Sequence, residues 1–289
     1  MEKMITSIKQ FGKRILIKSE YYRNNHSIEC IPLKKNRVNL EYWNYTKNLG
    51  DCLSPIIVDW MLKKRDIRSD KKLNCTKHLY AVGSVIGMGQ YFDATIWGAG
   101  LHTQAAIENV FKECKYRKYD IRAVRGPNTA EIMRKAGYYC PNVYGDPAVL
   151  MPLLYSPQNI CKQYKASIIH HYSVKKFETK DLHEISIRTG DYKYFIDEIC
   201  KSELVISSSL HGIILAECYG TPAIFFNEGL DEEIFKFQDW YYSTGRYDIR
   251  YATKIEDISN FVPMELPDLH NMQENLLRSF PYDLWLGKK

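Results

Sequence analysis

From about residue 40 onward, short β-rich apolar runs alternate along the chain with longer stretches of helical periodicity. In the first half, residues 79–83, 95–97 and 121–124 have the composition of strands. Residues 52–64 and 128–136 have the periodicity of helices. Strands that alternate with helices predict parallel sheets covered by helices.

The second half of the chain repeats this alternation. We expect strands at 167–170, 184–187, 204–207 and 223–226, and helices at 192–201 and 212–219. Between the halves, residues 151–163 lose their apolar periodicity and contain two prolines, which indicates a domain boundary. We therefore predict an α/β chain with two Rossmann-like domains, residues 39–153 and 154–267, facing each other across a cleft. Residues 268–289 are expected to form a helix that crosses back onto the first domain.

The composition limits the class of protein. Of the 289 residues, 45% are hydrophobic, as in globular proteins with a large core. The longest apolar runs are far shorter than a membrane span, and the N-terminus lacks the features of a signal peptide. The eight cysteines form no C-x-x-C pair and have no zinc spacing. Together these features favour a reducing, cytoplasmic location.

The excess positive charge is confined to the N-terminal segment. Residues 1–38 hold nine Lys and Arg against three Asp and Glu, whereas the rest of the chain is neutral. Apolar residues recur there near helical spacing. The segment is therefore either a basic amphipathic helix on an anionic membrane surface or a surface helix packed on the protein. Because no recognised motif accompanies the charge, nucleic-acid binding is not expected.

The stretch ELVISSSLHGIILAECYGTPAIFF places a histidine where a buried strand gives way to a helix. Ligands of parallel sheets bind beyond the carboxyl ends of strands, and the free N–H groups at a helix start form an anion site. The positive end of the helix dipole disfavours a protonated imidazole at His211, and a neutral imidazole suits a general base. The alternative is that a serine caps the helix and His211 is a half-buried structural residue.

This stretch resembles the signature of the polysaccharide pyruvyltransferase family. Other segments resemble family motifs in the same order: NLGDCLSP, AVGSVI, IWGAGL, AVRGPNTAEIM, YGDPAVLMP, KFQDWYYSTGR and FPYDLW. The resemblance spans roughly residues 40–285. Two departures are visible: the chain has HHY where the family commonly has P-H-Y, and residues 1–38 match no motif.

The resemblance implies both a fold and a reaction. The fold would be two Rossmann-like domains similar to the GT-B glycosyltransferases. The donor would be phosphoenolpyruvate, a co-substrate rather than a cofactor, and the product a cyclic pyruvate ketal with release of phosphate. The acceptor would be a sugar of a polysaccharide or of its polyprenyl-diphosphate-linked precursor, commonly galactose bridged at O4 and O6.

Phosphoenolpyruvate requires fixed cations and N–H donors for its carboxylate and phosphate. We expect Arg125, at a strand end, to bind these groups, with Arg246 as a second candidate; the alternative for both is a structural arginine. The other predicted donor-binding residues lie around the helix start: Ser208, Ser209, Leu210 and Gly212.

Ketal formation needs at least two proton transfers. His211 is the first candidate, as base to a sugar hydroxyl or as phosphate ligand, and His171 is the second. Because successive strand residues point to opposite faces, only one of His170 and His171 can face the cleft, and His171 matches the family position. Asp51 is the third candidate, with a helix N-cap as its alternative. The predicted acceptor-binding residues are Asn48, Gly50 and Trp240.

Other functions have weaker support. Asp146, before Pro147, is interpreted as a helix N-cap. No metal-binding motif or P-loop is present, and the Gly-x-Gly pairs lack the third glycine of a nicotinamide site. Two alternatives stay open: a nucleotide-sugar-dependent glycosyltransferase of the same fold, and a non-catalytic glycan-assembly protein.

Overall fold

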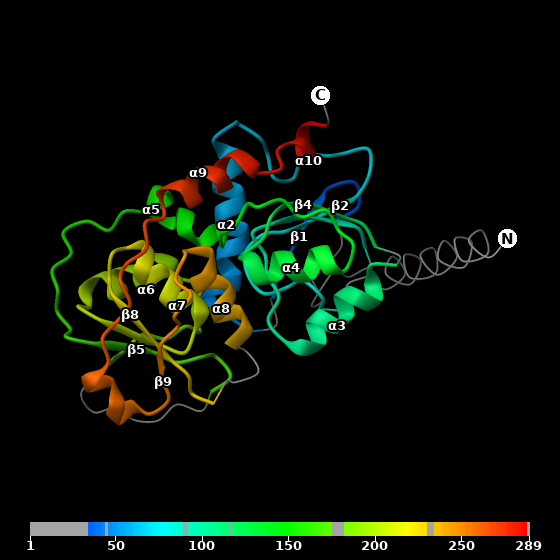
Figure 1. Ribbon diagram of the computed structural model, residues 1–289. Helices are drawn as coiled ribbons and strands as arrows, with labels where there is room; N and C mark the ends of the chain where they lie inside the picture. The colour runs from blue at the N-terminus through cyan, green and yellow to red at the C-terminus, as the bar shows by residue number, and fades with distance from the viewer. Residues whose placement is uncertain are drawn as a thin grey trace.

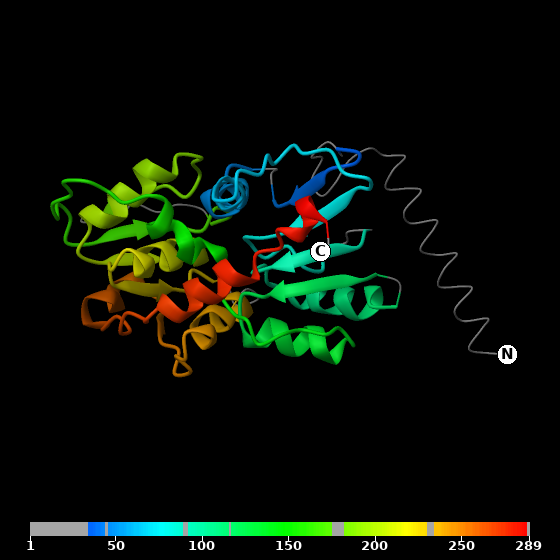
Figure 2. The same ribbon diagram turned by 90° about the horizontal axis from the view of Figure 1, so that it is seen from above.

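The computed structural model describes residues 34–43, 46–88, 92–115, 117–174, 182–229 and 234–287. These residues form two parallel sheets, one from each half of the chain, that lie on opposite sides of the molecule (Figures 1 and 2). The predicted basic helix of the N-terminal segment lies outside the described residues. Among the helices that the structure describes, none has both the length and the apolar character that crossing a membrane requires.

The first sheet has four parallel strands in the order β1-β2-β3-β4. The strands are β1 (Val38–Glu41), β2 (Lys77–Tyr80), β3 (Ala94–Trp97) and β4 (Tyr119–Ala123), and the helices are α2 (Leu49–Lys63), α3 (Gln104–Glu113) and α4 (Pro127–Lys135). Strand β1 was not predicted, and neither was α3, whose N-cap Thr103 accepts a hydrogen bond from the Ala106 N–H. Helix α4 begins with a proline, whose fixed φ suits a first helical position.

The second sheet is parallel in the order β6-β5-β7-β8-β9. Its strands are β5 (Ser167–Ile169), β6 (His183–Glu184), β7 (Val205–Ser207), β8 (Ala223–Phe226) and β9 (Tyr251–Ala252), and its helices are α6 (Tyr192–Lys201), α7 (Leu210–Cys218) and α8 (Ile234–Ser243). The bounds predicted for β8 and α6 are confirmed. Helix α6 begins where Asp191 accepts a hydrogen bond from the Tyr194 N–H.

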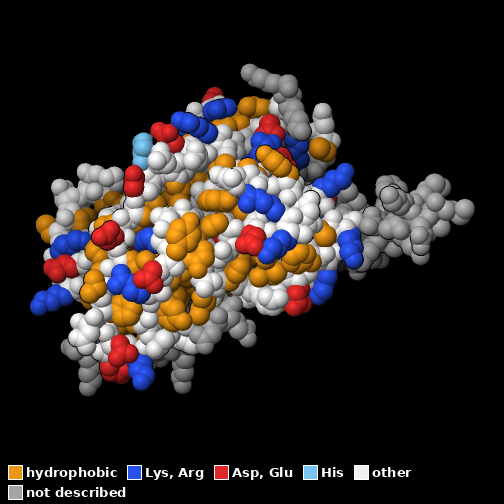
Figure 3. All heavy atoms as spheres, viewed as in Figure 1, with side chains coloured by type: hydrophobic (Ala, Val, Ile, Leu, Met, Phe, Trp, Pro, Cys, Tyr) orange, Lys and Arg blue, Asp and Glu red, His pale blue; other side chains and the backbone are white. Residues whose placement is uncertain are grey.

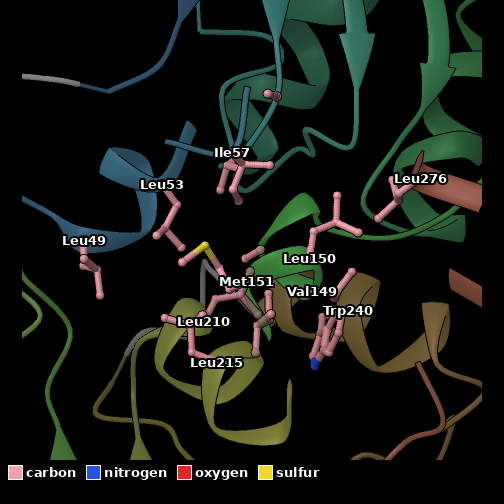
Figure 4. Close-up of a cluster of buried hydrophobic side chains, with 14 of the residues drawn as sticks. Leu49, Leu53, Ile57, Val149, Leu150, Met151, Leu210, Leu215, Trp240 and Leu276 are labelled. Atoms are coloured by element: carbon pink, nitrogen blue, oxygen red, sulfur yellow. The ribbon is translucent and has the colours of Figure 1, made fainter. Parts of the chain in front are cut away.

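One buried hydrophobic cluster includes side chains from both halves of the chain. Figure 4 shows Leu53 and Ile57 of α2 around the same centre as Leu150, Met151 and Leu215. Leu150 comes from η2 (Pro147–Leu150) and Met151 from α5 (Met151–Leu154), and these two helices connect the sheets. The division into two domains stays a prediction. The face in Figure 3 shows hydrophobic side chains over its middle, which is common for protein surfaces and does not by itself mark a site.

The C-terminal stretch returns to the first sheet as two helices, α9 (His270–Ser279) and α10 (Asp283–Leu286). The single helix predicted here is wrong, because Pro281 disfavours helical conformation at the residue before it and Phe280 is extended, with ψ at 129°. The C-terminal stretch contacts the first half of the chain. The Trp97 indole N–H donates to the Leu276 carbonyl at 3.0 Å, and Lys77 Nζ donates to the Leu284 carbonyl at 2.9 Å. A 3₁₀ helix, η4 (Ile255–Asn260), precedes this stretch.

Candidate active site

The first turns of α2 and α7 lie against each other, with Gly50 beneath the His211 ring. Both turns border a pocket of about 170 Å³. The pocket opens beyond the carboxyl ends of β2, β5 and β7, where sites of parallel sheets are expected. It brings together six of the predicted site residues, although they are up to 163 positions apart in the sequence: Asn48, Asp51, His171, Ser209, Leu210 and His211.

Helix α7 begins directly after the serines that end β7. Ser209 is its N-cap residue but makes no side-chain cap; its N–H donates instead to Ser207 Oγ at 3.0 Å. The alternative in which the serine side chain caps this helix is therefore not observed for Ser209. The first N–H groups of an α-helix have no partner within the helix, and such groups suit an anion.

The His211 imidazole lines the pocket and is 10% exposed. Its Nε2 lies 3.6 Å from Asp146 Oδ2. Its Nδ1 lies over Gly50, where a Cβ atom would come within 1.9 Å of it. Gly50 was predicted to bind the acceptor, but its place in the structure indicates that it makes room for the histidine ring.

Asp51 is a buried carboxyl in the first turn of α2. The helix begins at Leu49 with Asn48 as N-cap residue, so the interpretation of Asp51 as the N-cap is wrong. Asn48 Nδ2 donates to Asp51 Oδ2 at 2.7 Å. Burial raises the pKa of Asp51 from its ordinary value of 3.8 to about 6, although His211, the Asn48 hydrogen bond and Lys236 act in the opposite direction. A carboxyl with such a pKa can donate or accept a proton near neutral pH.

Of His170 and His171, it is His171 that lines this pocket, as favoured from the sequence. His170 Nδ1 lies 2.6 Å from Glu228 Oε1 instead. His171 Nδ1 lies 2.7 Å from Ser173 Oγ, and its Nε2 lies 3.3 Å from Lys236 Nζ. Because an ammonium group can only donate, Nε2 accepts in this contact, which leaves the proton of a neutral ring on Nδ1.

Lys236 is a pocket residue that the sequence analysis missed. It lies in α8, is 6% exposed and lines the pocket beside His171. Lysines in helices are usually solvated, so the sequence carried no signal for this position. A buried ammonium next to the start of α7 makes this side of the pocket suitable for an anion.

Arg125, the first candidate for donor binding, has a different environment. It is fully buried and does not line the pocket. Its Nε lies 3.2 Å from Asp239 Oδ2, its Nη1 donates to Ser84 Oγ at 2.6 Å, and its Nη2 donates to the Leu101 carbonyl. The prediction that Arg125 binds the donor is therefore not supported, because Asp239 of α8 is a buried carboxylate that pairs with the guanidinium. Arg125 supports the pocket from behind through Ser84, which does line it.

Arg246 and Trp240 also lie outside the pocket, because both bind Glu217. The Arg246 guanidinium holds this buried carboxylate through Nη1 at 2.6 Å and Nη2 at 2.8 Å. The Trp240 indole N–H donates to the same group at 2.9 Å, and the ring is fully buried. A buried carboxylate near the end of α7 requires such donors. Neither residue is therefore placed to bind donor or acceptor as predicted.

Two further predicted residues lie behind the pocket wall. Ser208 Oγ accepts a hydrogen bond from the His171 N–H at 2.6 Å and donates to Glu228. Gly212 packs on Ser207, where a Cβ atom would come within 2.3 Å of Oγ. Both hold the backbone that carries the pocket residues, and neither lines the pocket.

Asp146 caps η2 as predicted, through a 2.9 Å hydrogen bond from the Ala148 N–H to Oδ1. Within the described ranges, no cluster of His, Cys, Asp and Glu is arranged to hold a metal ion. The site therefore combines the buried ammonium of Lys236, the first turn of α7, and the side chains of His211 and Asp51.

The sequence is similar to those of known proteins. The sequence profile of the polysaccharide pyruvyl transferase family matches residues 33–229. The succinoglycan biosynthesis protein ExoV of Rhizobium meliloti is 32% identical over 136 residues, which cover 45% of this chain and 42% of ExoV. An uncharacterized protein of Acanthamoeba polyphaga mimivirus is 26% identical over 221 residues, which cover 71% of this chain and 74% of that protein.

A solved structure supports the fold. The structure of a functionally uncharacterized protein from Klebsiella pneumoniae aligns with a TM-score of 0.52 at 14% identity, and the alignment covers 84% of this chain and 98% of that one. At this identity the likeness concerns the mixed α/β fold alone. The family profile covers well over half of the sequence, from just before β1 to just after β8. The chain therefore belongs to the polysaccharide pyruvyl transferase family.

Proposed function

We propose that the protein transfers pyruvate from phosphoenolpyruvate to a sugar of a polysaccharide or of its lipid-linked precursor and releases phosphate. The observation that carries this proposal is the pocket at the starts of α2 and α7. In a chain of this family, it combines a buried ammonium, the N-terminus of a helix and two acid–base side chains.

The anion-binding groups of the pocket fit the donor. Phosphoenolpyruvate carries a carboxylate and a phosphate on adjacent atoms, and both need donors that stay charged or polar when water is excluded. Lys236 supplies a cation that His171 holds in place at 3.3 Å. The first turn of α7, from Leu210, supplies N–H groups. We assign donor binding to these groups in place of the two arginines.

The reaction balances without a further reactant. A first sugar hydroxyl adds to C2 of the enol while a proton is delivered to the C3 methylene, which becomes a methyl group. Phosphate then leaves C2, and a second hydroxyl closes the ring and loses its proton. One acceptor and one phosphoenolpyruvate give one ketal and one phosphate. We assign the proton removed from the first hydroxyl to His211 and the proton delivered to C3 to Asp51, whose raised pKa of about 6 keeps a protonated fraction available.

The acceptor rests on the family resemblance, and the location on the cysteine pattern and on the basic charge of residues 1–38. We propose galactose, bridged at O4 and O6, as the first acceptor to test. We also propose that the reaction takes place in the cytoplasm, with residues 1–38 at the membrane surface.

Lys236→Met tests the donor site. Methionine keeps the apolar stem but removes the charge, so the KM for phosphoenolpyruvate is expected to rise about 10- to 100-fold, as for loss of a hydrogen bond to a charged group. Steady-state kinetics with varied donor measure this. Lys63→Met is the matched control, because Lys63 is 75% exposed on α2. An unchanged KM in Lys236→Met would remove Lys236 from the donor site.

Gly50→Ala tests the space that the His211 ring occupies. Alanine is a better helix former than glycine, so the fold is expected to be retained. Its Cβ would nevertheless come within 1.9 Å of His211 Nδ1, so the ring must move. A displacement of about 1 Å is expected to lower turnover about 10²-fold. Gly190→Ala is the control, because a Cβ there meets no atom within 4 Å. Wild-type turnover in Gly50→Ala would contradict the assignment of His211.

Donor identity separates the proposed reaction from glycosyl transfer on the same fold. Purified protein is incubated with a glycan acceptor and either phosphoenolpyruvate or UDP-hexoses, and the release of phosphate and of UDP is measured. Acceptor-dependent release of phosphate is expected. Acceptor-dependent release of UDP would indicate a glycosyltransferase, and release of neither would favour a non-catalytic glycan-assembly protein.

A further inference from the structure

Among the described residues, two buried polar atoms beside the pocket face each other without hydrogen-bond partners. They are His211 Nε2 and Asp146 Oδ2, and the distance between them is 3.6 Å. Asp146 has no exposed surface, and the His211 side chain is 10% exposed. Buried polar atoms in proteins are nearly always hydrogen-bonded, so this pair calls for a physical explanation.

The other oxygen of Asp146 already has a partner, which leaves Oδ2 available to accept a hydrogen bond from His211. Its Oδ1 is occupied by the Ala148 N–H at the start of η2, which fixes the orientation of the carboxyl group. Asp146 can therefore cap η2 through Oδ1 and contact His211 through Oδ2 at the same time. A shift of a few tenths of an ångström would bring Nε2 within the usual range for an N–H···O bond.

We infer that Asp146 is the positioning residue for His211. Oδ2 accepts the Nε2–H proton, which selects one tautomer and places the lone pair on Nδ1. Nδ1 is the nitrogen on the Gly50 side of the ring, where the absence of a side chain makes room for the ring itself. The inference rests on the proposed function and deepens it. Nδ1 is the atom that takes the proton of the acceptor hydroxyl, and the carboxylate stabilises the imidazolium that results.

Other charged groups act on this pair from the elements packed around it. Asp51 approaches from α2, and its own pKa is affected by both His211 and Asp146. Arg125, after β4, carries the positive charge that interacts with Asp146 from behind the pocket. Lys236 acts on Asp51 from α8. Among the described residues, Asp146 is the carboxylate with an oxygen within 4 Å of a ring nitrogen of His211.

Asp146→Asn is the direct test, because it preserves the volume and the Ala148 hydrogen bond. The second atom of the amide becomes an NH₂ donor, which favours a lone pair on Nε2 and moves the proton to Nδ1. We expect ¹⁵N NMR to show the Nε2–H tautomer of His211 in the wild type and the Nδ1–H tautomer in the variant. We expect kcat to fall about 10²- to 10⁴-fold, with little change in the KM for phosphoenolpyruvate.

Two further variants keep the inference falsifiable. Asp191→Asn is the control: it makes the same substitution at a carboxylate that caps α6, away from the site. It is expected to leave the His211 tautomer and kcat unchanged. Asp146→Ser keeps a side chain that can cap η2, but serine is too short to reach His211. This variant is used if Asp146→Asn does not fold. It is expected to lose the preference for Nε2–H.

The outcomes separate this inference from the proposed function. The tautomer is measured without substrate. If Asp146 sets the tautomer but the wild type transfers no pyruvate, the positioning of His211 by Asp146 stands and the proposed function fails. If the wild type transfers pyruvate while the Asp146 variants keep its tautomer and kcat, the inference is overturned and the proposed function stands.

Discussion

Replacing His211 by alanine is expected to lower kcat for pyruvyl transfer about 10²- to 10⁴-fold, the usual contribution of a general base. The ring lines the pocket beside Asp51 and is the base that we assign to the acceptor hydroxyl. Because the base acts in the chemical step, the KM for phosphoenolpyruvate is expected to change much less than kcat. Phosphate release and pyruvylated product are measured together, and thermal unfolding verifies that the variant is folded.

The control for this variant is His270→Ala. His270 lies in α9, is 74% exposed and contacts Glu274 on the same helix. Its loss is expected to leave turnover within about twofold, since surface substitutions away from special features have small effects. A folded His211→Ala protein with near wild-type kcat would show that another group removes the proton.

Replacing Asp51 by asparagine is expected to stabilise the protein and impair catalysis at the same time. Burial raises the pKa of Asp51 from 3.8 to about 6, so ionisation of this carboxyl disfavours the folded state. The destabilisation is absent below about pH 4, grows as the pH rises towards 6 and is complete above it. Two pKa units correspond to about 3 kcal/mol, and asparagine does not ionise. The free energy of unfolding is therefore expected to rise by about 3 kcal/mol at pH 8 and by far less at pH 4.

Denaturant unfolding at both pH values measures this difference. Asp59→Asn is the matched control, because Asp59 is on the same helix, is 44% exposed and pairs with Lys63; a change of at most about 0.5 kcal/mol is expected. The wild-type rate is expected to fall as the pH rises through about 6, when the acid form of Asp51 is lost, and the variant should lack this dependence. Equal stabilisation at both pH values would contradict the raised pKa.

The sequence predicted those features that depend on local pattern. The alternation of strands and helices predicted two parallel sheets, and the bounds of β8 and α6 were correct. The position of His211 between a strand and a helix predicted its place at the carboxyl end of a parallel sheet, where it lines the pocket. His171 and Asp51 reach the same pocket because they too lie near a strand end or a helix start.

Features that depend on distant partners could not be predicted. In the sequence, Arg125 and Trp240 are residue types that commonly bind anions and sugars. In the structure, Arg125 pairs with the buried Asp239. Trp240 donates to the buried Glu217. Lys236 became a pocket residue because α8 packs beside His171, which a helical lysine does not reveal. The break between α9 and α10 had a visible signal in Pro281, which the helical periodicity outweighed.

The most direct test of the central claim is the mass of a glycan acceptor after incubation with the protein and phosphoenolpyruvate. The proposed reaction predicts a gain equal to one pyruvic acid less one water, with one phosphate released for each ketal formed and no gain with His211→Ala. Phosphate release without any change in the mass of the glycan, or transfer of a hexose from a nucleotide sugar to that glycan, would contradict it.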